Sequence, residues 1–198
     1  MPGCYSARML KRQSALPRIW LVSDERNDAV LERVLACLPR GSGLIFRHYH
    51  LPAAARRARF AALAKAAKRY GHCVAFSGTA RQARQWGADA VYGPPGIVTR
   101  GPAIARLVTA HSLAEIVAAR RARANAIVLA PVFATRSHPG RKWLGELRFR
   151  LLAARAGCPV IALGGMDARR GKTLGSVAWA AIDGLIPKAR LAGIPQDS

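Results

Sequence analysis

The segment at residues 131–145, PVFATRSHPGRKWLG, combines hydroxyl groups with positive charge. Hydroxyl and charged donors together form the short hydrogen bonds that hold a phosphate group. We therefore expect this segment to contact a small phosphorylated ligand, although His138 could also lie on the loop without a function. The candidate residues are Thr135, Arg136, Ser137, His138, Arg141 and Lys142.

A second candidate phosphate site lies at residues 161–173, IALGGMDARRGKT, which superficially matches a nucleotide-binding P-loop. The P-loop pattern needs four residues between its first glycine and Gly-Lys-Thr, because that length lets successive N–H groups surround the phosphates. Five residues separate Gly165 from Gly171, and six separate Gly164 from Gly171. We therefore interpret Gly164-Gly165 as the end of a strand before a helix, which also favours an anion.

The chain is strongly basic, with 32 Lys and Arg residues, 10 Asp and Glu residues and a formal net charge of +22. Such a charge attracts nucleic acid, phosphorylated metabolites and acidic lipids. The cations are spread along the chain, as in RRAR at 56–59 and 120–123, without an aromatic-basic nucleic-acid motif. We favour a solvated, arginine-rich surface and keep a nucleic-acid face as the alternative.

Length and cysteine spacing predict one cytoplasmic domain. The 198 residues suffice for a single buried core, and no apolar stretch has the roughly 20 residues of a membrane helix. The four cysteines lack metal-binding spacing, so we expect reduced thiols. We expect a flexible basic lead-in (1–16) without a secretory signal, one domain (17–191) and a frayed tail (192–198). An organelle transit segment is the alternative for the lead-in.

Short apolar runs alternate with alanine-rich helical stretches, a pattern typical of parallel βα units. Eight such runs are the number that a barrel of this type requires. The predicted fold is therefore α/β, a single (β/α)8 TIM barrel. The expected strands cover residues 19–23, 43–47, 72–76, 89–93, 105–110, 126–130, 159–163 and 176–181.

The expected helices have recognisable ends. Residues 52–70 place apolar side chains at helical spacing between a proline and a glycine. Ser112 and Glu115 have the spacing of a capping box, and Asp167 can cap the helix that follows the Gly-Gly pair. Residues 94–104, PPGIVTRGPAI, contain three prolines and two glycines, so we expect a loop there.

Ligands of TIM barrels bind at the C-terminal ends of the strands and in the loops that follow. Arg47 could contact phosphate there or pair with an acid, and Tyr92 could line the site or pack. Because His48 and His50 alternate with Arg47 and Tyr49, we interpret both histidines as surface groups rather than metal ligands. The strand ends select Arg47, Tyr49, Ser77, Gly78, Tyr92, His111, Gly164 and Gly165, together with the 131–145 loop.

Three stretches, Ala110-His111-Ser112, APVFATRSHPGRKWLG and PVIALGGM, occur in this order at a spacing that resembles the thiamine phosphate synthase and TenI family. IWLVSDE, FRHYHLP and WGADAVYG lie where that family has its early strands, so the resemblance covers residues 17–188. It implies a (β/α)8 barrel that handles the thiazole phosphate and aminopyrimidine precursors of thiamine. It also implies that the Thr135 and Ser137 hydroxyls contact the thiazole phosphate, and that the backbone of Gly164 and Gly165 receives it.

The half-site for the pyrimidine pyrophosphate departs from the family pattern, although Arg47 is retained. Where the synthases carry an Asn-Asp pair that holds magnesium, this chain has Ser77 and Gly78. Where a second magnesium aspartate is expected, the matching residue is Ile97, and the Gln and Lys of the second-strand motif are also replaced. Without these carboxylates, Mg²⁺ would have no hard oxygen ligands from the protein.

The TenI branch lacks the magnesium pair, and its thiazole tautomerases move a proton on the thiazole carboxylate phosphate with a histidine of the strand-five motif. His111 occupies that motif, and histidine is a residue type that suits a proton shuttle, although His111 could also simply bond the helix start. We expect a thiazole phosphate or thiamine phosphate-like ligand, His111 as the catalytic residue, and no cofactor. The residues are compatible with a monomer and with a homo-oligomer.

Two other functions stay open. One is a Mg²⁺-dependent thiamine phosphate synthase that joins aminopyrimidine pyrophosphate to thiazole phosphate. The other is a non-catalytic barrel that binds anions or nucleic acid through its positive charge.

Overall fold

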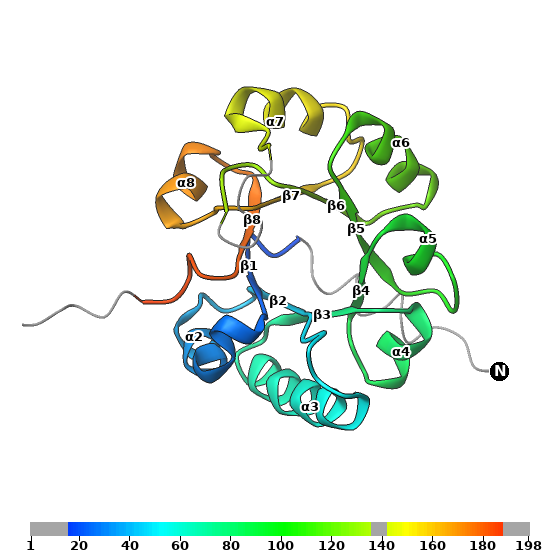
Figure 1. Ribbon diagram of the computed structural model, residues 1–198, viewed down its shortest axis with the longest axis vertical. Coiled ribbons are helices and arrows are strands. Elements are labelled where there is room, and N and C mark those ends of the chain that lie inside the picture. The colour runs from blue at the N-terminus through cyan, green and yellow to red at the C-terminus, as the bar shows by residue number, and fades with distance from the viewer. Residues whose placement is uncertain (1–15, 136–141, 188–198) are drawn as a thin grey trace, which may run out of the picture.

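The structure is a computed structural model that describes residues 16–135 and 142–187. Eight parallel strands close into a barrel in the order of the sequence, and helices surround it (Figure 1). This arrangement confirms the predicted α/β, single (β/α)8 TIM barrel, and every expected strand is present. The strands are β1 (Ile19–Val22), β2 (Gly43–Phe46), β3 (Cys73–Ser77), β4 (Ala90–Gly93), β5 (Ala105–Ala110), β6 (Ala126–Leu129), β7 (Val160–Leu163) and β8 (Ala178–Ala181).

The helices follow the strands in regular alternation, and the expected helix at 52–70 is present as α3. Among the helices of the described residues, none has the length and apolar character of a membrane-spanning segment. The helices are η1 (Glu25–Val30), a 3₁₀ helix, α2 (Leu31–Cys37), α3 (Ala53–Arg69), α4 (Ala80–Gln85), α5 (Pro95–Val98), α6 (Leu113–Arg121), α7 (Gly145–Ala153) and α8 (Ala168–Thr173).

The expectation of a loop at residues 94–104 is wrong for the four residues of α5. Pro94 is the N-cap and Pro95 is the first helical residue, where the missing N–H has no helical partner to lose. The Thr99 hydroxyl donates to the Pro95 carbonyl oxygen at 2.8 Å and covers the end of the helix. The prolines therefore start a helix here instead of preventing one.

The two predicted caps have different outcomes. The Asp167 carboxylate accepts a hydrogen bond from the Arg170 N–H at 2.8 Å, which confirms the cap of α8. The Ser112 hydroxyl accepts from the Glu115 N–H at 3.2 Å. The Glu115 carboxylate, however, accepts from the His111 N–H at 2.9 Å, one residue before the position that a capping box requires. Glu115 therefore ties the end of β5 to α6.

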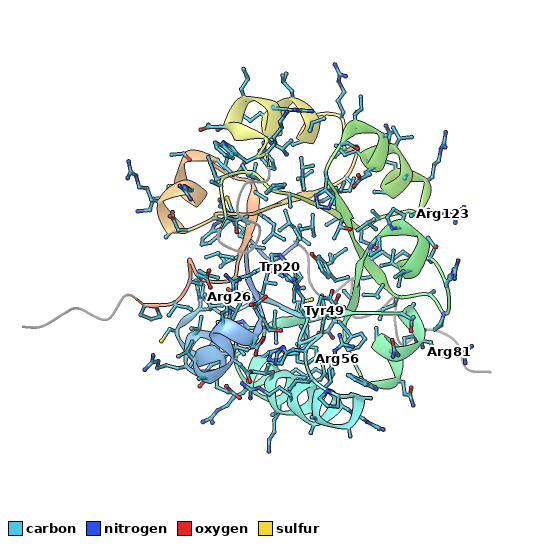
Figure 2. The ribbon with its side chains drawn as sticks, viewed as in Figure 1. Trp20, Arg26, Tyr49, Arg56, Arg81 and Arg123 are labelled. Carbon is cyan, nitrogen blue, oxygen red and sulfur yellow. The ribbon has the colours of Figure 1, made fainter. Side chains whose placement is uncertain are left out.

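Apolar side chains form two layers because successive residues of a strand point to opposite faces. One layer joins the strands to the helices, and the other contains strand residues only and fills the barrel. Trp20 lies in the barrel interior near its centre (Figure 2), where its indole N–H donates to the Pro17 carbonyl oxygen at 2.7 Å. The Trp20 ring occupies the space beside Gly43, where any Cβ atom would overlap it.

Candidate functional site

The backbone of Arg47, directly after β2, is held from two sides. Its N–H donates to the Ser23 hydroxyl oxygen at 2.8 Å, at the end of β1. Its carbonyl oxygen accepts two hydrogen bonds from the Arg56 guanidinium, at 3.1 and 2.8 Å. Arg47 thus lies at the C-terminal end of the barrel strands, as predicted, on a backbone fixed by β1 and α3.

The interpretation of His48 as a surface group is wrong. The His48 side chain is buried, its Nε2 lies 2.7 Å from an Asp28 carboxylate oxygen, and its Nδ1 lies 2.8 Å from the Ser23 hydroxyl. The strand ends at Phe46, so alternation does not continue, and a φ of 36° at His48 turns the ring inward against Phe46, with centroids 4.8 Å apart. His50 is exposed, as predicted.

Asp28, His48 and Ser23 form a chain of hydrogen bonds that ends at the Arg47 backbone. Burial lowers the pKa of His48 and outweighs the opposing effect of the Asp28 carboxylate. Burial raises the pKa of Asp28, but the hydrogen bonds from His48 and Arg59 outweigh burial, so the pKa of Asp28 is lowered overall. A neutral His48 that donates from Nε2 to Asp28 and accepts the Ser23 hydroxyl at Nδ1 satisfies every contact in this chain.

Tyr49 lies close to two guanidinium groups. Its ring centroid is 5.5 Å from the Arg47 Cζ atom and 5.5 Å from the Arg56 Cζ atom, within the range of cation–π attraction. The Tyr49 hydroxyl hydrogen-bonds the Ser77 hydroxyl at the end of β3, and 62% of the Tyr49 surface is exposed. Ser77 therefore joins Arg47 and Tyr49 in one polar group at the barrel mouth.

Arg56 supports this group from behind. Its guanidinium donates to the Ser77 carbonyl oxygen as well as to that of Arg47, and it packs 4.8 Å from the Phe76 ring centroid. Burial lowers the pKa of Arg56, but an arginine stays charged at neutral pH. Figure 2 places Arg56 between α3 and the strands, next to Tyr49. The sequence interpretation of RRAR at 56–59 as solvated surface is therefore wrong for this residue.

The barrel interior holds two titratable groups in their neutral form. Burial raises the pKa of Tyr92 to about 12, and burial also raises the pKa of the Cys73 thiol to about 12. Tyr92 is 7% exposed and belongs to the interior layer, so it packs beneath the mouth. Within the described residues, all three cysteines are free thiols; Cys4 lies outside them.

His111 follows β5 and is exposed. Its Nδ1 lies 2.6 Å from the carbonyl oxygen of Ala130, after β6. A carbonyl oxygen only accepts, so Nδ1 carries the proton and Nε2 keeps its lone pair in the neutral ring. Of the residues that the structure describes, none forms a hydrogen bond with Nε2. The arrangement gives His111 the tautomer of a general base.

Gly164 and Gly165 are packed against the loop that follows β6. Both have positive φ angles, 99° and 61°, which favour glycine. A Cβ atom on Gly164 would lie 2.7 Å from Pro131, and one on Gly165 would overlap the Ala134 carbonyl oxygen. The Phe133 N–H donates to the Gly164 carbonyl oxygen at 3.0 Å. The structure thus brings the two glycines and residues 131–134 together.

Arg170 was not predicted as a site residue, yet it lies beside the glycine pair. Its guanidinium donates to the Gly165 carbonyl oxygen and lies 4.8 Å from the Phe133 ring centroid. Thr135 is described at the end of this loop, whereas Ser137 and His138 lie outside the described residues. The phosphate roles predicted for these residues remain predictions.

The Gly-Lys-Thr sequence forms the last three residues of α8, so it is part of a helix and not of a P-loop. Gly171 is buried in that helix, and a Cβ atom there would lie 2.5 Å from the Trp179 indole nitrogen. The glycine therefore has a packing role against β8.

The ends of β3 and β4 carry no carboxylate, because Ser77, Gly78 and Pro94 occupy them. Across residues 16–135 and 142–187, no three His, Cys, Asp or Glu side chains are grouped so that they could hold a metal ion. Ser77 is already bonded to Tyr49, and Ile97 on α5 is apolar. The donor set present there does not fit Mg²⁺, which prefers several oxygen ligands including carboxylates.

A family model described as thiamine monophosphate synthase matches residues 19–184. A search of curated proteins finds no match. The solved structure of a thiamine phosphate pyrophosphorylase from Pyrococcus furiosus has a TM-score of 0.69 and 21% identity, over 83% of this chain and 84% of that chain. A thiamine phosphate pyrophosphorylase from Bacteroides thetaiotaomicron has a TM-score of 0.56 and 12% identity, over 84% of this chain and 82% of that one.

The same fold occurs outside this group. An HpcH/HpaI aldolase/citrate lyase family protein from Burkholderia cenocepacia has a TM-score of 0.60 and 15% identity, over 90% of this chain and 92% of that chain. Similarity at these identities shows the shared barrel and no shared activity. The family model covers most of the chain and includes His111 and the Gly164-Gly165 pair, so the chain belongs to the thiamine monophosphate synthase family.

Proposed function

We propose that this protein binds a thiazole phosphate at the ends of β5, β6 and β7, and isomerises the thiazole carboxylate phosphate with His111 as the proton-transferring residue. The observation that carries the proposal is the hydrogen bond between His111 Nδ1 and the Ala130 carbonyl oxygen. This bond occupies Nδ1 and leaves Nε2 available beside the loop that leads to Thr135. The same loop packs on Gly164 and Gly165.

The reaction requires one group that removes a proton from a carbon of the thiazole ring and delivers a proton to another carbon of the same molecule. Nε2 of His111 can do both, because the imidazole gains one proton and then gives one up, so the reaction is a net isomerisation. His111 is exposed, so the Nε2 proton can exchange with solvent between the two steps. Its partner Ala130 can accept from Nδ1–H in the neutral and in the protonated ring. The bond therefore holds the ring in place throughout the transfer.

The phosphate group would lie against the backbone of Gly164 and Gly165. Both glycines are partly exposed, so a ligand can reach their backbone, although the 131–134 loop fills the space where side chains would lie. The Arg170 guanidinium, bonded to the Gly165 carbonyl, adds a fixed positive charge beside them. Thr135 and Ser137 would supply hydroxyl donors, and Arg47 and Tyr49 would contact the opposite end of the ligand.

Thiamine phosphate synthase activity is the second candidate, favoured by the retained Arg47 at the mouth and by the names of two solved structures with this fold. That reaction expels pyrophosphate, and the leaving group needs strong electrostatic stabilisation. Arg47 and Tyr49 lie where they could contribute, but the described residues at the ends of β3 and β4 do not fit Mg²⁺. We therefore place isomerisation first.

The direct test is to incubate the purified protein with the thiazole carboxylate phosphate in deuterated water and follow the isomers by proton NMR. We expect conversion of the isomer together with deuterium incorporation at the carbon that receives the proton, without added Mg²⁺. Release of pyrophosphate from the aminopyrimidine pyrophosphate and thiazole phosphate, dependent on Mg²⁺, would instead support the synthase. If the protein catalyses neither reaction, both catalytic proposals fail and the chain is a binding protein.

A further inference from the structure

Acidic residues are almost absent from one long stretch of the chain. Residues 33–114 contain thirteen lysines and arginines and a single acidic residue, Asp89. The Asp89 carboxylate accepts a hydrogen bond from the Val74 N–H at 2.8 Å and so has a structural role. Residues 24–32, in contrast, contain four acidic residues, of which Asp28 and Glu32 pair with Arg59. The charge of residues 33–114 is thus almost unbalanced.

The helices of this stretch lie next to one another on one side of the barrel, α3 beside α4 and α4 beside α5 (Figure 1). The Lys68 ammonium on α3 donates to the Gly87 carbonyl oxygen after α4, at 2.9 Å. A Cβ atom on Gly101, after α5, would lie 3.3 Å from the Arg81 backbone nitrogen. We call the exposed cations of this surface the α3–α4 face: Arg57, Lys65, Lys68, Arg69, Arg81, Arg84 and Arg100.

No acidic side chain of the described residues neutralises the positive charge of the α3–α4 face. Arg56 and Arg59 on α3 turn inward and bond within the barrel mouth and to α2, but Arg57 points outward with exposed neighbours. Lys65 and Arg69 are four residues apart on a helix, a spacing at which like charges repel. In the part of the chain that the structure describes, no member of the face forms an ion pair. A bound polyanion would relieve this repulsion.

The neighbours of these cations indicate which polyanion fits. Apart from cations, the exposed residues of α3 are alanines, and no exposed large apolar side chain lies on α3 or α4 among the described residues. Membrane surfaces and protein partners usually engage apolar anchors, and single strands stack their bases on aromatic rings. A charged surface without such anchors fits a regular array of phosphates. Because α3 alone spans about 25 Å, its cations can contact several phosphates of one duplex.

From this surface we infer that the α3–α4 face binds double-stranded nucleic acid through its phosphate backbone, without reading its sequence. Arg81, labelled in Figure 2, extends outward from α4 and away from the barrel. The face is separate from the ends of β5 to β7, so this inference does not depend on the proposed isomerase activity.

Two variants with equal charge test the inference. The face variant replaces Arg57, Lys65, Arg69 and Arg81 with Gln. The control variant replaces four exposed cations on the α7–α8 side with Gln: Arg148, Arg155, Arg169 and Lys172. Each removes four positive charges, so both lower the formal net charge from +22 to +18. Fluorescence anisotropy is measured with duplexes of about 20 base pairs of DNA and of RNA over a range of salt concentrations. Circular dichroism verifies that both variants fold.

We expect the wild-type chain to bind at least one duplex, and the face variant to lose about 10-fold or more in affinity with a shallower salt dependence. The control variant should stay within about 3-fold of wild type. Equal losses in both variants would show an effect of net charge alone and would overturn the inference. So would absence of duplex binding at about 0.15 M salt, or binding confined to phosphatidylglycerol vesicles.

Discussion

The Nδ1 atom of His111 lies 2.6 Å from the carbonyl oxygen of Ala130, so the end of β5 is hydrogen-bonded to the chain that leaves β6. The His111 N–H is also bound, to the Glu115 carboxylate at 2.9 Å. Ring and backbone are therefore both oriented before any ligand arrives. A group positioned in this way loses little entropy when it transfers a proton.

Replacement of His111 with Gln should abolish most of the isomerisation. We expect the rate to fall by about 100-fold or more, because general base catalysis is worth about 10²–10⁴ in rate, while thiazole phosphate affinity stays within about 3-fold. Proton NMR measures the rate, and calorimetry measures the affinity. His50→Gln, at another exposed histidine, is the matched control and should keep full activity. An active H111Q variant would remove His111 from the mechanism.

Gly165→Ala should disrupt the contact between the β6 loop and the glycine pair. A Cβ atom there overlaps the Ala134 carbonyl oxygen at a φ of 61°, so we expect a loss of about 1–3 kcal/mol in the free energy of unfolding. We also expect weaker thiazole phosphate binding. Gly175→Ala is a close control, because Gly175 has a φ of 71° but no atom within 4 Å of the added Cβ. Equal effects of both variants would mean that backbone conformation alone matters.

Arg56→Gln should loosen the Arg47–Tyr49 corner. The variant leaves the carbonyl oxygens of Arg47 and Ser77 without their charged donor, which should cost about 1–3 kcal/mol in the free energy of unfolding. Urea denaturation measures this cost. Arg57→Gln makes the same change of charge at an exposed neighbour and should cost less than about 0.5 kcal/mol. A similar cost for the two variants would contradict the supporting role of Arg56.

His48 should make stability depend on pH. Burial lowers its pKa below the ordinary 6.5, although the Asp28 carboxylate opposes this, so the folded protein keeps the ring neutral. The unfolded chain protonates the ring near pH 6.5 and therefore binds more protons below that pH. The free energy of unfolding should fall as pH drops from about 6.5 toward the lowered pKa.

Urea denaturation between about pH 7.5 and about pH 5.5 measures this dependence. His48→Ala should lower the free energy of unfolding by about 1–3 kcal/mol at neutral pH, because Ser23 and Asp28 lose their shared partner. It should also flatten the dependence on pH in this window. His50→Gln should change the slope only slightly, because His50 is a smaller cause of the lowered pKa of His48 than burial is. The same slope in wild type and H48A would show that another group titrates.

The barrel was predictable because its strands and helices differ in period and length. Eight apolar runs and their intervening alanine-rich stretches leave few other folds, and the structure has a strand at each run. The error at residues 94–104 arose because proline breaks a helix in its interior but starts one at its first turn. Sequence alone does not show which of these positions a proline occupies.

The site was only partly predictable, because several of its contacts join residues far apart in the chain. His48 was misjudged since the strand ends at Phe46 and the backbone then turns through a left-handed conformation. The role of Arg56 had a detectable signal, because Arg56 lies four residues before the buried Phe60 and therefore on the same side of α3. Arg57, in contrast, lies four residues before the exposed Ala61 and therefore on the solvent side of α3. For Ser23 and Arg170, the pattern of residue types held no such signal.

Calorimetric titration of the purified protein tests the central claim most directly, with thiazole phosphate carboxylate and aminopyrimidine pyrophosphate as separate ligands, each with and without Mg²⁺. The account predicts tight binding of the thiazole compound that is indifferent to Mg²⁺, and weak binding of the pyrimidine compound under both conditions. Tight pyrimidine binding that requires Mg²⁺ would contradict it, because the described ends of β3 and β4 offer no carboxylate for that ion. Synthase activity would then become the first candidate.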